Sequence, residues 1–595
     1  MLTLGIHDGH NATAALMQDG QLLAAVSEEK MTYKKNDMGF PQNAINECLK
    51  ITGVKPEKID LVAFSTINLP LNYLRIKREY SFTIRDWLNE QEYYWKPKIF
   101  AGRINQEYLA KINEDERFKT PQTYSFDGIP YLLTDEENRF YLNKIRKGTL
   151  QKLYGIEPAK IREFRHHLCH QYYAYFGSPF RGEKTLIVTA DGGGDGENGT
   201  VSIAENDKIR NIASNNCSDL ARIYRYITLI LGMKIGEHEY KVMGLAPYAT
   251  NYEIKKCDKV FKDVFHVPDL LIEYKNRPPD LFFYFRDNLA DCRFDGIAGG
   301  VQIMVEEVGG EWLKKLTTKL NLARVVFSGG LSQNVKLNKV IGELDSVKEF
   351  YITASGGDES LAIGACYAAQ KIQGQDHFQS MEDNYLGPEP QQPEIEVALK
   401  KLTKYKITSP VTNTEIARLL SQNLVIARLK GRLEFGARAL GNRSILANPA
   451  NREMVRKINN KIKFRDFWMP FAPSILDSYA DRYLINPKKF LSDHMTMAFD
   501  TTEEGREKLA AAIHSDDHTV RPQIVRRSTN PDYYDLIEEF AKITGIGAVL
   551  NTSFNLHGLP IVCNPQQAVQ VFENSDLDGM VIGDYLIMRN ERLCP

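Results

Sequence analysis

The sequence predicts an α/β protein with two domains. Two segments share one design, an apolar strand followed by a glycine-containing loop and a second strand: LTLGIHDGHNATAALM at the start of the chain, and KTLIVTADGGGDGENGTVSI further along. A stretch rich in Pro, Gln and Glu, including LGPEPQQPEIE, then interrupts the pattern before strand signals resume. A chain of 595 residues is also too long for a single hydrophobic core.

We expect the first domain to cover residues 1–375 and to contain a duplicated fold, because the strand–loop–strand design occurs twice. The later segments ARVVFSGGLSQNVKLNKVI and FYITASGGDESLAIGACYAAQKI each predict a buried strand, a glycine pair and a helix. Residues 67–147 are rich in Tyr, Trp, Lys and Arg, carry no clear motif, and are interpreted as a helical addition.

A linker is predicted at residues 376–395 from its composition. The remaining residues, 396–595, contain the strand signals LVIARL, IGAVLNTSFN and GMVIG with helical stretches between them. They predict a second, smaller α/β domain.

The composition limits the possible functions. With 43% hydrophobic residues, 25% charged residues and a formal net charge of -1, the chain lacks the basic surplus that is typical of nucleic-acid-binding proteins. Its eight cysteines are dispersed without a CxxC pair, which argues against a disulfide framework or a cysteine zinc site. We find no signal-peptide pattern and no membrane-length apolar run, and expect a cytoplasmic protein.

Two histidines and two aspartates predict a metal site in the first domain. His166 and His170 lie four residues apart in a helical segment and share one face, whereas His167 points elsewhere. Asp191 and Asp358 each end an apolar strand beside glycines. This donor set suits iron(II), manganese or zinc. The alternatives are a packed histidine pair and two turn-capping aspartates.

The glycine loops of the same domain are candidates for binding phosphate through backbone N–H groups. Together with the SGGD loop that ends at Asp358, they predict a nucleotide held between two lobes. The alternative is that they are ordinary hairpin connectors. The loop residues are Gly192, Gly193 and Gly194 in the first loop, and Gly329 and Gly330 in the second.

In the second domain, basic residues interleaved with Gly, Phe, Trp and Pro predict a site for a polyanion. They are Arg432, Arg438, Arg443, Lys463 and Arg465. The polar residues Asn551, Thr552, Ser553 and Asn555 follow a buried strand and are able to hydrogen-bond an acyl or phosphate group. The alternatives are a solvated basic surface and a local side-chain turn.

Taken together, the ordered segments resemble the O-carbamoyltransferases of the NodU/CmcH family over nearly the whole chain. The matching pieces are HNATAAL, VSEEK, HHLCH, TADGGGDG, KVMGLAPYA, SGGLSQNVKLN, GGDES, EFGARALGNRSIL, MPFAPSIL and NTSFN. The resemblance implies a Kae1-like domain of the actin/hexokinase (ASKHA) type followed by a YrdC-like α/β domain. It also implies that the C-terminal domain makes carbamoyladenylate from ATP and carbamoyl phosphate, and that the N-terminal domain transfers the carbamoyl group to a hydroxyl.

The resemblance also assigns residues. It implies a divalent metal on His166, His170, Asp191 and Asp358, acid–base chemistry by Asp8 and His10, and a further role for Glu239 or Lys241. Magnesium is expected to accompany ATP. Nucleotide and anion contacts are implied for Gly192, Gly193, Gly194, Gly329, Gly330 and Asn334, and in the second domain for Arg438, Arg443, Lys463, Arg465, Arg521, Asn551 and Ser553.

We expect a small-molecule hydroxyl acceptor as the partner, no nucleic acid and no membrane, with a homodimer as one open assembly. A transferase that makes threonylcarbamoyl groups on transfer RNA is the nearest alternative, but it requires a basic RNA surface. A hydrogenase-maturation carbamoyl enzyme requires zinc-finger cysteines, which the absence of CxxC argues against. An inactive actin-like binding protein is the alternative from another class, and it leaves the histidine–aspartate set and the second domain unexplained.

Overall fold

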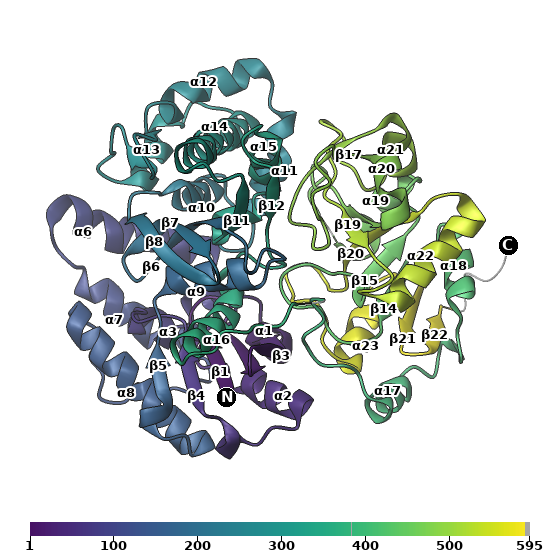
Figure 1. The fold of residues 1–595 in the computed structure, drawn as a ribbon, viewed down its shortest axis with the longest axis horizontal. Coiled ribbons are helices and arrows are strands. Elements are labelled where there is room, and N and C mark those ends of the chain that lie inside the picture. Colours follow the sequence, from purple (N-terminus) through teal and green to yellow (C-terminus); the bar gives the residue numbers. More distant parts are fainter. Residues whose placement is uncertain (382, 464, 590–595) are drawn as a thin grey trace. The chain divides into compact units, whose positions relative to one another are not determined.

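The computed structural model describes residues 1–381, 383–463 and 465–589, and it divides into two compact units, Met1–Met381 and Glu382–Pro595 (Figure 1). Each unit has its own sheets and its own buried apolar residues. The division falls inside the segment expected as a linker, residues 376–395.

The first unit contains two five-stranded sheets with the same strand order and the same directions. In each sheet, a three-stranded antiparallel meander is extended by two parallel strands on the side of its first strand. This topology confirms the duplication that the sequence predicts. The first sheet has the order β3-β2-β1-β4-β5 and consists of β1 (Leu2–His7), β2 (Thr13–Gln18), β3 (Gln21–Ser27), β4 (Leu61–Phe64) and β5 (Ile161–Glu163). The second has the order β12-β11-β6-β7-β8 and consists of β6 (Thr185–Gly194), β7 (Glu197–Glu205), β8 (Lys208–Asn215), β11 (Arg324–Ser328) and β12 (Glu349–Tyr351).

Two helices that pack against each other join the sheets. Helix α9 (His166–Phe176) packs on the second sheet, α16 (Leu361–Ile372) packs on the first, and the two helices cross (Figure 1). The crossing is close because α16 carries small residues: a β-carbon at Gly364 would lie 2.0 Å from the carbonyl oxygen of Cys169 on α9. On its other side, α16 approaches β1 so closely that a β-carbon at Gly5 would lie 2.0 Å from the carbonyl oxygen of Ala362.

We predict that Gly364→Ala destabilises the protein by about 1–3 kcal/mol, because the added methyl group forces α9 and α16 apart. Gly148, in the exposed interior of α8 (Asp135–Tyr154), is the matched control, because a β-carbon there meets open space. Gly148→Ala is expected to stabilise by about 0.5–1 kcal/mol through the lower entropy of the unfolded chain. Denaturant unfolding of both variants provides the measurement. Equal stability of the two would contradict the close crossing.

The remaining helices of the first unit fill the connections between strands. Residues 67–147, expected as a helical addition, are indeed mostly helical and lie between β4 and β5. Their elements are α3 (Leu71–Arg75), α4 (Arg78–Ser81), α5 (Ile84–Glu90), the π-helix η2 (Gln91–Trp95), α6 (Lys96–Ala101), α7 (Gln106–Glu114) and the start of α8. The other helices are α1 (Glu28–Thr32), α2 (Gln42–Thr52), α10 (Leu220–Ile230), α11 (Glu239–Leu245), α12 (Asn251–Phe261), α13 (Leu281–Asn288), α14 (Phe294–Leu320) and α15 (Val335–Glu343). A short hairpin, β9 (Phe265–His266) with β10 (Glu273–Tyr274), stands apart from the sheets.

The second unit is built on a mixed sheet in which eight strands of the described residues take part. Its order is β13-β22-β21-β14-β15-β20-β16-β19. The strand signals of the sequence correspond to β14, β20 and β21. The strands are β13 (Lys406–Thr408), β14 (Ile426–Leu429), β15 (Arg443–Ala447), β16 (Ala472–Leu476), β19 (Gln523–Val525), β20 (Ala548–Ser553), β21 (Gly579–Ile582) and β22 (Tyr585–Met588). A separate pair is formed by β17 (Leu484–Ile485) and β18 (Asp500–Thr501). The helices are α17 (Gln392–Leu399), α18 (Asn413–Ser421), α19 (Glu453–Ile458), α20 (Ala480–Tyr483), α21 (Glu503–Lys508), α22 (Pro531–Thr544) and α23 (Pro565–Glu573).

Most of the segment that the sequence marks as a linker is structured. On the first-unit side, the ring of Phe378 packs 4.5 Å from that of Phe176, and Gln379 donates its backbone N–H to Gly20. On the second-unit side, residues 384–388 exchange backbone hydrogen bonds with residues 433–435, and α17 already begins at Gln392. The predicted linker was therefore too long. Part of this Pro- and Gln-rich segment pairs with a loop of the second unit, and another part forms the first turn of α17, where proline is well tolerated.

Among the described residues, no helix is long and apolar enough to cross a membrane. The seven described cysteines are free thiols, and Cys594 lies outside the described residues.

Candidate active site

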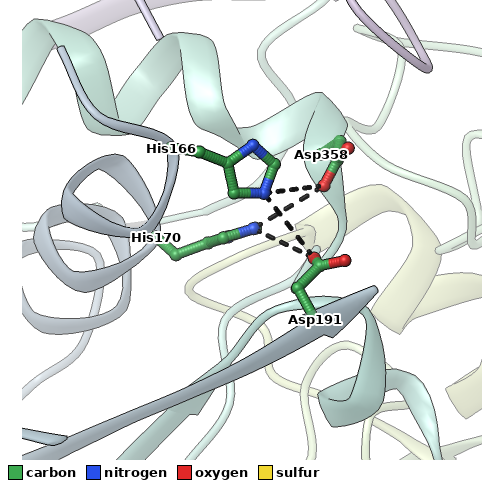
Figure 2. A group of neighbouring side chains, drawn as sticks. All are labelled: His166, His170, Asp191 and Asp358. Atoms are coloured by element: carbon green, nitrogen blue, oxygen red, sulfur yellow. Dashed lines mark ion pairs between the residues drawn. The ribbon is translucent and has the colours of Figure 1, made fainter. Parts of the chain in front are cut away.

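The four predicted metal ligands converge in the first unit. One ligand atom from each of His166, His170, Asp191 and Asp358 can be chosen so that all four lie within 4.8 Å of one another (Figure 2). The Nε2 atom of His170 lies 3.2 Å from Oδ2 of Asp191 and 3.6 Å from Oδ1 of Asp358. The Nε2 atom of His166 lies 3.9 and 3.6 Å from the same two oxygens. The structure therefore brings together the four residues that the sequence groups, and metal binding by them stays a prediction.

The fold explains why residues so far apart in sequence meet. The two histidines begin α9 at i and i+4, Asp191 lies where β6 leaves the body of its sheet, and Asp358 opens the turn that leads into α16. Because α9 and α16 cross each other and α9 packs on β6, the three elements bring their functional ends to one place. Gly194 is required there, because a β-carbon at this position would lie 2.3 Å from the ring of His166.

The donor set fits a divalent cation. Both Nε2 atoms are buried and, among the described residues, neither has a hydrogen-bond partner. Nδ1 of His170 lies 3.4 Å from the hydroxyl of Ser328, which leaves Nε2 as the ring nitrogen able to bind a metal ion. Burial opposes a charged ring, but the carboxylates of Asp358 and Asp191 outweigh this effect and raise the pKa of His166 to about 9. The buried cluster thus already gathers the negative charge that a cation requires.

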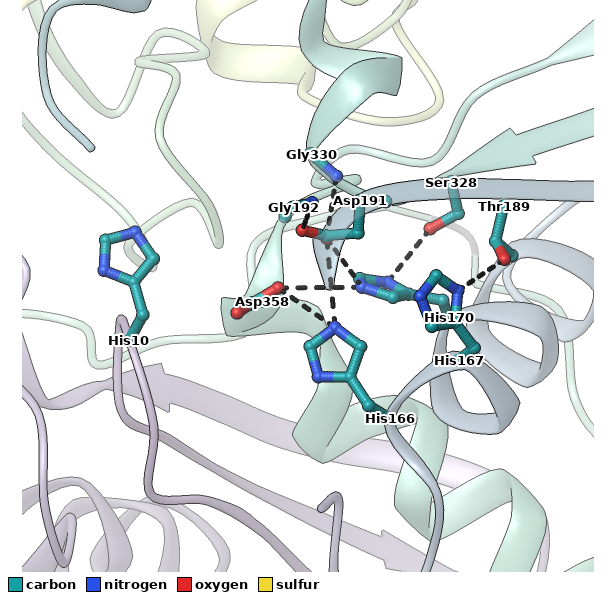
Figure 3. A network of polar contacts seen from close by, with 12 residues as sticks. His10, His166, His167, His170, Thr189, Asp191, Gly192, Ser328, Gly330 and Asp358 are labelled. Carbon is teal, nitrogen blue, oxygen red and sulfur yellow. Dashed lines mark hydrogen bonds and ion pairs between the residues drawn. The ribbon is translucent and has the colours of Figure 1, made fainter. Parts of the chain in front are cut away.

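His167 stands outside the cluster, as its position on the helix predicts. Its Nε2 donates to the carbonyl oxygen of Glu197 at 3.1 Å, and its Nδ1 accepts from the hydroxyl of Thr189 at 2.7 Å (Figure 3). Burial, with the nearby His166 and His170, lowers the pKa of His167 to about 3, so this ring is neutral and structural.

Three backbone N–H groups of the glycine loops donate hydrogen bonds to acceptors within the protein. The backbone N–H groups of Gly192 and Gly330 both donate to the carboxylate of Asp191 (Figure 3), and Gly329 donates to the carbonyl oxygen of Gly356. Gly329 has a φ of +91°, and a β-carbon there would lie 2.2 Å from the carbonyl oxygen of Ala190. These three N–H groups thus have protein acceptors in this structure, and their use as a phosphate cradle stays a prediction. Gly193 (φ +126°) and Gly194 lie in the same loop.

Asn334, the other residue expected to contact the nucleotide, makes hydrogen bonds within the fold. Its side chain caps α15 by accepting from the N–H of Leu337 at 3.1 Å, and it exchanges two hydrogen bonds with Gln302. Asparagine is a favoured N-cap residue, so the capping of α15 accounts for an asparagine at this position.

Asp195 was missed by the sequence analysis. Its carboxylate accepts the backbone N–H of His166 at 2.8 Å, the first residue of α9, and those of Ile67 and Asn68. A carboxylate at a helix N-terminus is favourable, and this one ties the glycine loop to the start of α9. Its position four residues after Asp191 in DGGGD was the sequence feature that could have identified it.

His10 lies on the loop between β1 and β2, apart from the metal cluster in Figure 3. The neutral ring of His7 supports this loop: its Nε2 donates to the carbonyl oxygen of His10 at 3.0 Å, and Ser65 donates to its Nδ1. Burial is the main reason that the pKa of His7 is lowered to about 4. His10 is thus placed by its backbone, while its side chain remains partly exposed.

Asp8 does not orient His10. Its carboxylate is fully buried and accepts hydrogen bonds from Nε and Nη2 of Arg146 at 2.8 and 2.6 Å and from the hydroxyl of Tyr124 at 2.7 Å. Arg146 on α8 also bonds to Thr66, so the pair joins the helical addition to the first sheet. Arg146 and Tyr124 occupy the carboxylate in this structure, and the acid–base role implied for Asp8 stays a prediction. The carboxylate next to His10 belongs to Glu79.

Of the pair Glu239 and Lys241, Glu239 is the residue that interacts electrostatically with His10. It begins α11 and accepts the N–H of Gly236 at 2.6 Å. Burial raises the pKa of Glu239 above its ordinary value. Lys241 is buried two residues further along the same helix.

In the second unit, three of the predicted basic residues gather. Burial and the neighbouring charges of Arg438 and Arg465 lower the pKa of Arg521 well below its ordinary value. The three side chains are each partly buried, and like charges gathered in such a place are unfavourable unless an anion joins them. This cluster, Arg438, Arg465 and Arg521, is the candidate anion site.

Two other basic residues have different roles. The fully buried Arg443 donates to backbone carbonyl oxygens of Gly431 and Asn442 at 2.9 and 3.0 Å, and to that of Pro388. Lys463, also buried, donates to Ser553 and Asn555, including both backbone carbonyl oxygens. Carbonyl groups of nearby loops accept hydrogen bonds from both side chains in this structure, and the anion contacts expected of them stay predictions.

Asn551 has a buried side chain with its amide N–H groups committed and its oxygen open. It donates to the carbonyl oxygen of Ala439 at 3.0 Å and to the hydroxyl of Ser474 at 2.9 Å. Its Oδ1 atom has no hydrogen-bond partner among the described residues. Ser553, two residues further along β20, donates to Oδ1 of Asn555. The hydroxyl of Thr552 between them accepts from Arg465 at 3.1 Å, which connects this strand to the arginine cluster.

We predict that Arg521→Gln weakens the binding of carbamoyl phosphate or of inorganic phosphate by about 10- to 100-fold, the usual size of a lost hydrogen bond to a charged group. Arg443→Met is the contrasting variant, expected to lower the free energy of unfolding because buried carbonyl groups lose their donors. Calorimetric titration and denaturant unfolding separate the two effects. Unchanged anion affinity in Arg521→Gln would remove the candidate anion site.

Comparison with known proteins decides the family. Residues 3–367 match the family described as Carbamoyltransferase N-terminus, and residues 417–589 match the family described as Carbamoyltransferase C-terminus. The chain belongs to the carbamoyltransferase family. It is an enzyme of that class, which removes the inactive actin-like binding protein from the alternatives.

Two similar proteins match nearly the whole carbamoyltransferase chain, and a third matches part of it. An uncharacterized protein of Methanocaldococcus jannaschii is 31% identical over 612 residues, covering 99% of this chain and 100% of the relative. The nodulation protein NolNO of Sinorhizobium fredii is 27% identical over 599 residues, covering 98% of this chain and 79% of the relative. Nodulation protein U of the same organism is 32% identical over 235 residues, 39% of each chain.

Proposed function

We propose that this carbamoyltransferase uses ATP and carbamoyl phosphate to make carbamoyladenylate, and then transfers the carbamoyl group to a hydroxyl of a small molecule. The observation that carries the proposal is the division of its polar groups: the arginine cluster lies in the second unit, whereas the metal cluster and His10 lie in the first. The two sets suit different steps, one requiring anion binding and the other proton removal and charge neutralisation.

The second unit is assigned the activation step. The bound carbamoyl group is a poor acyl donor, because its nitrogen delocalises charge into the carbonyl. Water first cleaves carbamoyl phosphate to carbamate and inorganic phosphate, and a carbamate oxygen then attacks the α-phosphorus of ATP with release of pyrophosphate. The resulting carbamoyladenylate carries AMP as a good leaving group, and one ATP is consumed. Arg438, Arg465 and Arg521 provide fixed positive charge for phosphate oxygens, and Asn551 offers an open amide oxygen to an N–H group of the ligand.

The first unit is assigned the transfer step. His10 accepts the proton of the acceptor hydroxyl as its oxygen forms a bond with the carbamoyl carbon, and AMP leaves with the electron pair of the broken bond. His166, His170, Asp191 and Asp358 would hold a divalent cation, which supplies charge neutralisation for phosphate oxygens when bound. The fold supports this assignment, since a Kae1-like ASKHA domain has a duplicated sheet like that of the first unit, and a YrdC-like domain is the proposed counterpart for the second.

The partial reaction without an acceptor tests the proposal. We expect release of pyrophosphate that requires ATP and carbamoyl phosphate together, with magnesium present. The rate should fall in Arg521→Gln and persist in His10→Asn. Pyrophosphate release that is independent of carbamoyl phosphate, or its loss in both variants, would contradict the division of steps.

A further inference from the structure

Glu79, in the helical addition that the sequence analysis left without a function, lies beside His10. Its Oε2 atom is 3.9 Å from Nδ1 of His10, a buried nitrogen without a hydrogen-bond partner among the described residues. Gly236 (φ +76°) closes over the pair: a β-carbon there would lie 3.2 Å from Oε2 of Glu79 and 3.5 Å from Cε1 of His10. Three chain segments therefore meet around this one imidazole.

The contacts of His10 favour one tautomer. The side-chain nitrogen of Asn11 lies 3.4 Å from Nε2 of His10, and an amide N–H pointing at this atom requires a lone pair on it. The ring proton then belongs on Nδ1, which faces Glu79. This arrangement leaves Nε2 as the basic atom.

Two arginines hold Glu79 in place and in its ionised form. Nη2 of Arg225, on α10, donates to its two carboxylate oxygens at 2.9 and 2.7 Å, and Nη2 of Arg78 donates at 3.1 Å. Burial favours the neutral acid, but Arg225 and Arg78 outweigh it and lower the pKa of Glu79 to about 2. Glu79 is therefore a fixed negative charge in a rigid setting.

We propose that Glu79 is a positioning residue for His10: it holds the Nδ1–H tautomer and stabilises the imidazolium that forms when Nε2 takes the proton of the acceptor hydroxyl. The proposal rests on the proposed role of His10 as the base. In hydrolases with a catalytic triad, a carboxylate orients histidine through a hydrogen bond to Nδ1–H, whereas here the carboxylate lies 3.9 Å from that atom and acts through its charge. Here the carboxylate comes from a helix inserted between β4 and β5.

The other ionisable groups around His10 set the sign of the expected effects. Glu239 interacts with it from α11, and His7, at the end of β1, contacts its backbone carbonyl. Arg225 and Arg78 act on it across Glu79. Removing the Glu79 charge destabilises the imidazolium, so the pKa of His10 should fall. Removing the Arg225 charge unmasks Glu79, so the pKa of His10 should rise.

The test combines kinetics with a direct titration of His10. The variants are Glu79→Gln and Arg225→Gln, the second at a partly exposed side chain that tolerates substitution better. Glu237→Gln is the matched control, because this buried carboxylate lies in the same loop as Gly236 but pairs with Lys35 and Lys234. The NMR signal of His10 in histidine-labelled protein is assigned with His10→Asn, and acceptor transfer is followed against pH.

We expect Glu79→Gln to lower transfer by about 100-fold, the lower end of the range for acid–base groups. The titration of His10 and the acid limb of kcat/KM should move down by about one pH unit, the effect of losing an opposite charge at this range. Arg225→Gln should move both up. Glu237→Gln should move neither, and carbamoyladenylate formation should persist in all three.

The outcomes separate the two proposals. Normal transfer in His10→Asn would overturn the role of His10 as the base, whatever Glu79→Gln does. Loss of transfer in His10→Asn, with an unshifted His10 titration in Glu79→Gln, would overturn the role of Glu79 alone. If Glu79→Gln does not fold, a downward or absent shift in Arg225→Gln overturns it equally. Glu79→Asp, which keeps the charge, should retain the pH profile of the unsubstituted enzyme and recover part of the rate.

Discussion

Replacing His10 by Asn is expected to lower carbamoyl transfer to the acceptor by about 10²- to 10⁴-fold. Asparagine keeps a polar side chain of modest size, but it cannot accept a proton near neutral pH. The loop itself should keep its shape, because His7 holds it through the backbone carbonyl of His10 and not through its ring. The measurement is the rate of acceptor carbamoylation by the purified variant.

The partial reaction is the control for this variant. Formation of carbamoyladenylate from ATP and carbamoyl phosphate should persist in His10→Asn, because that step is assigned to the second unit. Near-normal transfer would show that His10 is structural. Loss of both steps in a folded protein would place His10 in nucleotide handling instead.

Replacing Asp358 by Asn is expected to weaken metal binding by at least about 10- to 100-fold, and transfer should fall with it. The substitution preserves the shape of the side chain and removes the charge that lies 3.6 Å from both histidine Nε2 atoms. Metal content after dialysis, measured by elemental analysis across iron, manganese and zinc, gives the direct result, and transfer is measured on the same samples.

His167→Asn is the matched control, because His167 lies between the two ligands on α9 but bonds to Thr189 and Glu197. It should cost about 1–3 kcal/mol of stability through unsatisfied buried partners, without changing the metal stoichiometry. Unchanged metal affinity in Asp358→Asn, or equal metal loss in His167→Asn, would remove the four-residue assignment.

Local patterns were enough to predict much of the fold. The repeated strand–glycine loop–strand segments predicted the duplicated sheets, and the apolar runs around Ile426, Leu550 and Val581 predicted three strands of the second unit. The grouping of the histidines and aspartates was also predictable, because helical spacing and aspartates beside glycines are local features. Asp358, however, opens the turn before α16 and does not end a strand as the sequence predicted, since β12 already ends at Tyr351. The linker was overestimated, since composition alone does not show that residues 384–388 pair with a distant loop.

The contacts of several site residues could not be predicted, for a common physical reason. Asp8, Arg443 and Lys463 were assigned to ligands from local motifs, yet each also has protein partners elsewhere in the fold. Glu79 was missed for the same reason, because its neighbours His10 and Arg225 are distant in sequence. Hydrogen-bond saturation of a buried polar group depends on tertiary contacts, which no local pattern contains.

The central claim is that the enzyme moves an activated carbamoyl group onto a hydroxyl, and one incubation tests it most directly. The pure protein is mixed with ATP, magnesium, carbamoyl phosphate and a panel of hydroxylated metabolites, and the products are identified by mass spectrometry. We expect one acceptor class to gain a carbamoyl group on oxygen, with one AMP formed per product and no product without ATP. Carbamoylation that does not require ATP, or that appears on transfer RNA and on none of the hydroxylated small molecules, would contradict the claim.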